Sequence, residues 1–154
     1  MGLTHEDFMR EALQEAALSP GEVPVGAVIV LDGQIIARAH NERENESHDP
    51  FAHAELVVMK RAAQMLGRRR LTGCRLYVTL EPCPMCAGAM VMACLDACYF
   101  GAFDRKQGCC GSVYDLANEQ SFYHRLPCYG GILENESAAL LQAFFDDKRR
   151  HIVK

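Results

Sequence analysis

Two short segments, His53-Ala54-Glu55 and Pro82-Cys83-Pro84-Met85-Cys86, constrain the fold most, because their side chains form one chemical unit only if the chain brings them together. Two nearby cysteines and an imidazole are a borderline-soft ligand set suited to Zn²⁺. Catalytic zinc sites usually keep three protein ligands and one open position. We therefore predict one zinc per chain, held by His53, Cys83 and Cys86.

The second segment is typical of a helix start. Pro84 fits the first helical position, because the N–H group that it lacks would have no intrahelical partner there. Cys83 would then lie at the N-cap and Cys86 in the first turn, where unpaired backbone N–H groups and the helix dipole favour negatively charged sulfur. Both cysteines are therefore predicted to bind metal as thiolates.

The first segment indicates another helix start. Asp49 and Pro50 are typical of an N-cap and a first helical position, which would place His53 near the end of the opening turn. Glu55 is not needed as a ligand if water takes the fourth position. Zinc lowers the pKa of such a water to about 7, and a neighbouring carboxylate can accept its proton and pass it to a leaving group. Glu55 is the candidate general acid–base residue.

Other interpretations of the cysteines stay open. A C-x-x-C pair by itself is also typical of structural zinc and of redox pairs. The main metal alternative is a structural site of four cysteines, Cys83, Cys86, Cys94 and Cys98. That site leaves His53 and Glu55 without a role. The adjacent Cys109 and Cys110 are predicted to be small buried residues, because nothing near them in sequence completes a metal set.

Length and composition indicate one domain, residues 1–154, since 154 residues with 49% hydrophobic content can bury a sizeable core. The segment 1–10 is polar and acidic with no apolar signal core, so the eight cysteines favour a reducing, cytoplasmic location. No apolar run reaches membrane-spanning length. A net charge of −4 gives no global sign of nucleic-acid binding, although a local basic patch remains compatible with it.

Hydrophobic periodicity predicts an α/β fold. Helices are expected over 4–19, 50–66 and 84–93, with a helix start at 113–117 and a last helix from 135 or 137; strands are expected over 23–31, 34–40, 76–80 and 97–101. Residues 121–131 are expected to form a loop. Strand, helix and strand around the cysteines imply a parallel pair, with the cysteines at its carboxyl edge.

Three further stretches carry charge or aromatic residues. Arg68-Arg69-Arg70 follow the second helix, and a solvated helix end and phosphate contact are both compatible with them. The segment 103–112 is predicted to be a binding loop. The last helix is expected to bury Ala138, Leu140, Leu141, Phe144 and Phe145, with both phenylalanines in the core.

Four stretches together, 22–28, 49–55, 76–89 and 100–102, resemble bacterial tRNA adenosine deaminases of the cytidine deaminase superfamily. The pattern H-x-E followed by P-C-x-x-C is the signature of zinc nucleobase deaminases. The resemblance implies a three-layer α/β/α fold with a central five-stranded mixed sheet, and a homodimer. It also implies hydrolytic deamination of the wobble adenosine of a tRNA anticodon to inosine. The expected partner is the anticodon stem-loop of an arginine tRNA.

The resemblance also assigns roles to residues. His53, Cys83 and Cys86 match the zinc ligands, and Glu55 matches the proton shuttle. Zinc-bound hydroxide would attack C6 of the adenine. Glu55 would then protonate N1 and the departing amine.

The same comparison implies a substrate pocket. Asn41 matches a residue that hydrogen-bonds the flipped-out base, and Val23 matches a pocket wall. Ala54 is expected to contact the substrate, and Asp104 to contact the anticodon backbone.

Two alternatives to this function remain. A free-base or nucleoside deaminase of the same fold would have a small closed pocket capped by the last helix, whereas a tRNA enzyme would have a basic face around the pocket mouth. A non-catalytic RNA-editing partner or structural zinc module belongs to another class. It would have no use for Glu55 beside an open metal position.

Overall fold

The computed structural model describes residues 2–19, 21–44 and 48–152, and its centre is a mixed sheet of five strands in the order β2-β1-β3-β4-β5. The strands are β1 (Gly26–Leu31), β2 (Gln34–His40), β3 (Cys74–Leu80), β4 (Ala97–Ala102) and β5 (Cys128–Tyr129). β1 pairs antiparallel with β2 and β3, and β3, β4 and β5 run parallel. The predicted hairpin and the predicted parallel pair are both confirmed.

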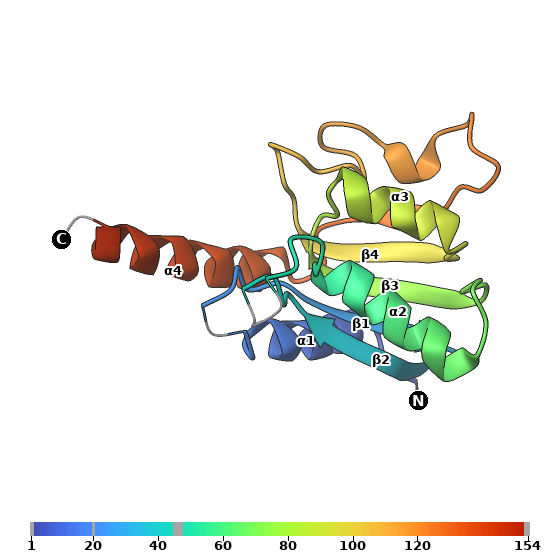
Figure 1. The fold of residues 1–154 in the computed structure, drawn as a ribbon, viewed down its shortest axis with the longest axis horizontal. Coiled ribbons are helices and arrows are strands. Elements are labelled where there is room, and N and C mark those ends of the chain that lie inside the picture. The colour runs from blue at the N-terminus through green and yellow to red at the C-terminus, as the bar shows by residue number, and fades with distance from the viewer. Residues whose placement is uncertain (1, 20, 45–47, 153–154) are drawn as a thin grey trace.

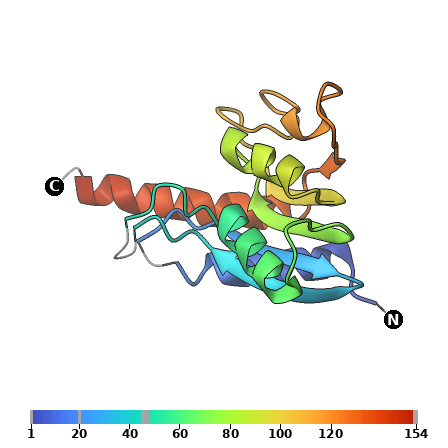
Figure 2. The same cartoon turned by 45° about the vertical axis from the view of Figure 1, so that its right-hand side comes forward.

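Helices cover both faces of the sheet (Figure 1). The helices are α1 (His5–Ala16), α2 (Ala54–Leu66), α3 (Pro84–Met92) and α4 (Glu134–Ile152), with a 3₁₀ turn η1 (Leu116–Asn118). α1 and α4 pack on one face, and α2 and α3 on the other (Figure 2). This is the three-layer α/β/α arrangement that the resemblance implied.

The side chains of β1 alternate between the two faces of the sheet, and this alternation explains the layers. Val28 and Val30 pack with Phe8 and Met9 of α1, whereas the alternate residues of the strand point into the larger core beneath α2 and α3. Gly26 lets α1 approach closely, because a Cβ there would lie 2.0 Å from the carbonyl oxygen of Ala12. The near-continuous apolar sequence of β1 therefore reflects burial on both faces.

α2 begins later than predicted. The carboxylate of Asp49 accepts the N–H of Phe51 at 2.9 Å, and its carbonyl accepts the N–H of Ala52 at 3.2 Å. These bonds close a turn rather than a helix. His53 is therefore the N-cap, with φ −68° and ψ 147°, and Glu55 lies in the first turn.

Two expectations for the segment after β4 were wrong. Residues 113–115 form an exposed turn rather than a helix start, with a bridge between Cys110 and Asp115, and the only helical piece there is η1. Residues 121–131 contain β5, which a loop prediction misses because two residues are too few to show alternation.

The expectation of a buried C-terminal helix was wrong as well. Ser137, next to Gly101, is buried, whereas the residues predicted to be buried are not: Ala138 is exposed, Leu140, Leu141 and Phe144 are half-buried, and Phe145 is 46% exposed. α4 packs on β4 and β3 at its start and then runs past the end of the sheet (Figures 1 and 2). Part of its apolar face is left to line another surface.

Candidate metal centre and substrate pocket

The three predicted ligands come together at the starts of two helices. His53 is the N-cap of α2, and Cys83 is the N-cap of α3 with Pro84 following it. His53 Nδ1 lies 3.7 Å from Cys83 Sγ and 3.5 Å from Cys86 Sγ. Tetrahedral zinc with ordinary Zn–N and Zn–S bonds needs a nitrogen–sulfur separation of about 3.6 Å. The donor set and its spacing therefore fit zinc.

The electrostatics of this cluster favour cation binding. Hydrogen bonds from Cys86 and His53 lower the pKa of the Cys83 thiol to about 4. The hydrogen bond between the two cysteine side chains raises the pKa of Cys86, and the hydrogen bond to Cys83 raises the pKa of His53. One thiolate is thus present before metal arrives, and binding displaces the proton held by Cys86.

Glu55 lies beside the ligands without belonging to their cluster. It is 4% exposed, and this burial raises the pKa of its carboxyl to about 7. A carboxyl group that titrates near neutral pH can both accept and donate a proton under physiological conditions. Its environment suits the role of proton shuttle.

The raised pKa of Glu55 predicts a pH-dependent stability of the metal-free protein. Protonated Glu55 is favoured in the folded state, so its stabilising contribution is complete below pH 4.5 and is lost as pH rises to about 7. We expect chelator-treated Glu55→Gln to match the unsubstituted protein at pH 4 and to exceed it by about 3 kcal/mol at pH 8. Urea unfolding across this range measures the difference.

A matched control is Glu119→Gln, because Glu119 is an exposed carboxylate on the loop before β5. Replacing this exposed side chain should change the free energy of unfolding at pH 8 far less than Glu55→Gln does. If the free energy of unfolding of Glu55→Gln changes with pH in the same way as that of the unsubstituted protein, burial does not perturb the pKa of Glu55.

Asn41 bridges the helix start to the neighbouring loop. Its side-chain oxygen accepts the Ala54 N–H at 2.8 Å, and its amide nitrogen donates to the Val23 carbonyl at 3.0 Å. An asparagine amide has two N–H groups and two acceptor sites, so one of each stays available. Asn41 is 5% exposed and lines the pocket, with its orientation fixed by Ala54 and Val23.

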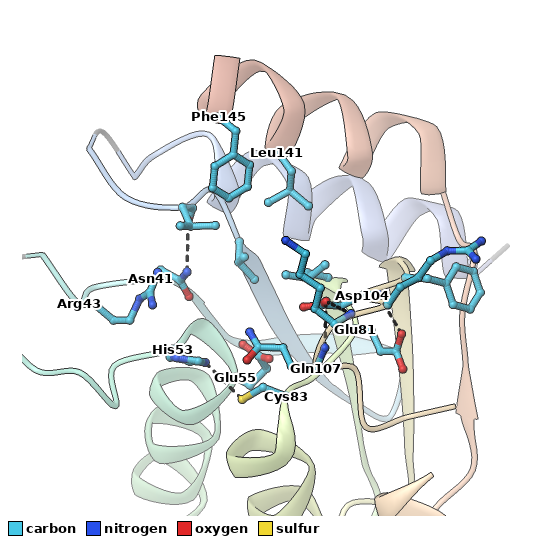
Figure 3. A pocket seen from close by; sticks show the side chains of 16 residues that line it. Asn41, Arg43, His53, Glu55, Glu81, Cys83, Asp104, Gln107, Leu141 and Phe145 are labelled. Carbon is cyan, nitrogen blue, oxygen red and sulfur yellow. Dashed lines mark hydrogen bonds between the residues drawn. The ribbon is translucent and has the colours of Figure 1, made fainter. Parts of the chain in front are cut away.

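The cluster lies at the floor of a pocket of about 700 Å³ (Figure 3). His53, Glu55 and Cys83 form the floor, and Leu141 and Phe145 of α4 lie across from them. The remaining lining residues are Val23, Val25, Asn41, Arg43, Leu80, Glu81, Phe103, Asp104, Arg105, Lys106 and Gln107. The exposed apolar part of α4 thus forms a pocket wall, which the prediction of a core role for Phe145 missed.

Glu81 is a loop-positioning residue that the sequence prediction did not identify. It is 2% exposed, and its carboxylate accepts the backbone N–H groups of Asp104, Cys110 and Ser112 at 2.9–3.1 Å, together with the Ser112 hydroxyl. Gly108 makes this approach possible, since a Cβ there would lie 2.4 Å from Glu81 Cδ. Glu81 therefore holds the loop that forms one pocket wall.

We expect Glu81→Gln to destabilise the protein by about 3 kcal/mol, because an amide nitrogen then faces backbone N–H groups and buried donors lose their acceptor. Urea unfolding of the zinc-loaded protein measures this, with Glu119→Gln as the control. Equal stability of the two variants would mean that the loop keeps its conformation without the carboxylate.

Other candidate residues are placed away from this centre. Arg68, Arg69 and Arg70 follow the carboxyl end of α2, and the Arg68 guanidinium donates to the carbonyls of Arg70 and Thr72 at 2.6 and 3.0 Å. The helix separates this run from His53 by about 20 Å.

The four-cysteine alternative is not formed, because Cys98 clusters with Cys110 and Cys128 instead. Within the polar loop before α2, residues 45–47, including Glu46, lie outside the described residues.

The comparisons with known proteins define the class first. Residues 3–102 match the cytidine and deoxycytidylate deaminase zinc-binding region, in agreement with the fold and the ligand cluster. The tRNA-specific adenosine deaminase of Bacillus subtilis (strain 168) is 50% identical over 147 residues, which cover 94% of this chain and 91% of the relative. The tRNA-specific adenosine deaminase of Aquifex aeolicus (strain VF5) is 45% identical over 96% of this chain and 98% of its own length.

Comparison with solved structures also identifies deaminases. A structure from studies of A-to-I editing by tRNA:A34 deaminases superimposes with a TM-score of 0.82 at 46% identity, over 87% of this chain and 98% of that one. The guanine deaminase of Bacillus subtilis superimposes with a TM-score of 0.63 at 32% identity, over 94% and 95%. The chain belongs to the tRNA-specific adenosine deaminase family of the cytidine and deoxycytidylate deaminases.

Proposed function

We propose that this protein hydrolyses adenosine to inosine at the wobble position of a tRNA anticodon. The observation that carries the proposal is the buried Glu55 beside a zinc-compatible His53–Cys83–Cys86 cluster, at the floor of a pocket with cationic residues along its wall. The relation to tRNA-specific adenosine deaminases supports the substrate. The expected substrate is the anticodon stem-loop of an arginine tRNA.

Zinc, when bound, supplies Lewis-acid activation of the water that attacks C6 of the adenine. Glu55 accepts one proton from that water on a carboxylate oxygen and passes it to N1. It then accepts the proton of the hydroxyl group now on C6 and passes it to the amine, which leaves as ammonia. The free N–H and acceptor site of the Asn41 amide can hydrogen-bond the base edge, while Val23 forms a wall of the pocket. Positioning and proton transfer are thus divided between residues on different segments.

The wall residues suit an RNA substrate better than a free base. A cavity of about 700 Å³ holds several times the volume of one nucleobase. Arg43, Arg105 and Lys106 line it and can pair with phosphates beside the target nucleotide, while Phe145 offers an aromatic face. The anticodon loop is already single-stranded, so turning the base into the pocket costs less than it would in a duplex. We assign Asp104, which also lines the pocket, to the neighbouring backbone.

Free-base deamination is the second candidate. It is favoured by the position of Leu141 and Phe145 across the pocket from the metal ligands, because a terminal helix there could close over a small substrate. The similarity to a guanine deaminase points the same way. Release of ammonia from guanine or cytosine, with no reaction on tRNA, would establish this alternative.

A binding experiment tests the RNA assignment through charge. The double variant Arg105→Ala/Lys106→Ala should bind tRNA more weakly, and the slope of log K against log salt should fall by about 0.7 for each phosphate that is no longer neutralised. Arg69→Ala/Arg70→Ala removes the same charge at the far end of α2 and should leave the slope unchanged. If the slope for Arg105→Ala/Lys106→Ala equals that of the unsubstituted protein, Arg105 and Lys106 do not belong to the RNA interface.

We further propose that residues 1–154 act as a single deaminase domain, that the protein is a cytoplasmic homodimer, and that one zinc occupies the catalytic centre. In the described ranges, no helix combines the length and the apolar character needed to cross a membrane. Sedimentation measures the dimer, and metal analysis of the cysteine variants described below measures the zinc.

A further inference from the structure

Three cysteines that the catalytic centre does not use meet at another place in the fold. Cys98 lies on β4, Cys128 on β5, and Cys110 on the segment that leaves β4 and returns to β5 (Figure 1). Their sulfur atoms all lie within 4.8 Å of one another. Cys98 is completely buried, Cys110 is 6% exposed and Cys128 is half-buried. Cys109 and Cys110 are buried, as the sequence predicted, but the fold brings Cys110 next to two cysteines that are distant from it in sequence.

Backbone hydrogen bonds hold this cluster in place. Cys98 and Cys128 are paired across the parallel strands, and the Cys98 N–H donates to the Pro127 carbonyl at 3.0 Å. The Cys110 N–H donates to Glu81 Oε2 at 3.1 Å. The three thiols are thus positioned by β4, by β5 and by the carboxylate that organises the pocket loop.

We propose that Cys98, Cys110 and Cys128 form a second metal site that binds a thiophilic cation such as Zn²⁺. Thiolate ligands select zinc and other soft cations over Mg²⁺ or Ca²⁺. A tetrahedral zinc with three sulfur ligands needs sulfur–sulfur separations of about 3.8 Å, and the three sulfur atoms already lie within 4.8 Å of one another. Water or a further donor would complete the fourth position.

The charges around the cluster favour a cation. The Glu81 carboxylate lies against the cluster, because it accepts the Cys110 N–H. Asp115 lies beside the cluster too, because its backbone forms an antiparallel bridge with Cys110. A divalent cation would offset this concentration of negative charge.

Such a site has a structural consequence for the pocket. The segment from 103 to 127 contains only η1 as regular structure, and β5 has two residues. Segments of this length with so little secondary structure are uncommon in compact domains. A metal bound by all three cysteines would join both ends of the segment to its middle and stabilise the loop that carries Asp104, Arg105 and Lys106.

The test is metal stoichiometry in defined variants after loading with Zn²⁺ and gel filtration. The unsubstituted protein should hold two zinc ions, Cys98→Val/Cys110→Ala/Cys128→Val one, and Cys83→Ala one. Cys109→Ala is the matched control, since Cys109 is buried next to Cys110 but outside the cluster, and it should keep two. One zinc in the unsubstituted protein, unchanged by the triple substitution, would overturn the proposal.

A second measurement remains informative if the triple variant does not fold. Cd²⁺ added to metal-free Cys83→Ala should give the ultraviolet charge-transfer absorption of cadmium–thiolate bonds, and the single substitution Cys128→Ala should reduce it. Hydrogen exchange in 110–129 should slow when the ion is added. No absorption in Cys83→Ala would refute the site whatever the result for the catalytic centre.

Discussion

Glu55→Ala should lower the turnover rate by about 10²–10⁴-fold while the protein keeps its catalytic zinc. The proposed metal ligands His53, Cys83 and Cys86 are untouched, and their spacing is set by the starts of α2 and α3. The substitution removes the carboxyl group with a raised pKa from the pocket floor, so protons must move through solvent. Single-turnover deamination and metal analysis of the same preparation measure both effects.

Glu55→Gln is the conservative partner of this variant, because it keeps the shape of the side chain but cannot transfer a proton. It should be as inactive as Glu55→Ala and should bind substrate as tightly as the unsubstituted protein. Glu119→Ala, at an exposed position, should keep full activity. Turnover near the normal rate in either Glu55 variant would remove Glu55 from the proton-transfer role.

Cys83→Ala should abolish activity and lower the zinc content by one ion per chain. Two donors remain, and a catalytic zinc usually requires three protein ligands. The variant should also lose the stability that catalytic zinc provides, which is about 4 kcal/mol when free zinc is about 1,000 times its dissociation constant. Metal analysis and thermal unfolding with and without chelator measure the two losses.

Cys109→Ala is again the matched control, because it removes a buried thiol from the same region without touching either cysteine cluster. It should keep the metal content of the unsubstituted protein and the stabilisation by zinc. A Cys83→Ala protein with undiminished zinc would mean that the ion is held elsewhere.

The sequence predicts the candidate metal centre well, because its residues lie at helix starts that the local sequence largely determines. Pro84 correctly indicates the start of α3 and the N-cap position of Cys83. The β1–β2 hairpin and the parallel β3–β4 pair also follow from the sequence pattern, whereas the β1–β3 pairing and β5 do not. The sequence pattern places His53 one turn too deep in its helix, since the side chain and carbonyl of Asp49 form a turn that competes with helix initiation.

The sequence was least informative where long-range contacts decide the structure. Glu81 precedes the cysteine motif directly, yet its role depends on N–H groups more than twenty residues away. The cluster of Cys98, Cys110 and Cys128 likewise forms only when β5 joins the sheet. α4 is amphipathic in sequence, but nothing local shows that it leaves the sheet and lines the pocket with Phe145. These features could be found only from the three-dimensional structure.

The most direct measurement combines the competing substrates in one assay. Zinc-loaded protein is incubated with an unmodified arginine tRNA carrying adenosine at the wobble position, the same tRNA with guanosine there, and free guanine, cytosine, adenosine and cytidine. Inosine is mapped by sequencing, and ammonia is measured for each small substrate. We predict inosine at the wobble position alone and no ammonia from the free compounds. Ammonia from a small substrate with unmodified tRNA would contradict the proposed function while leaving the metal centre in place.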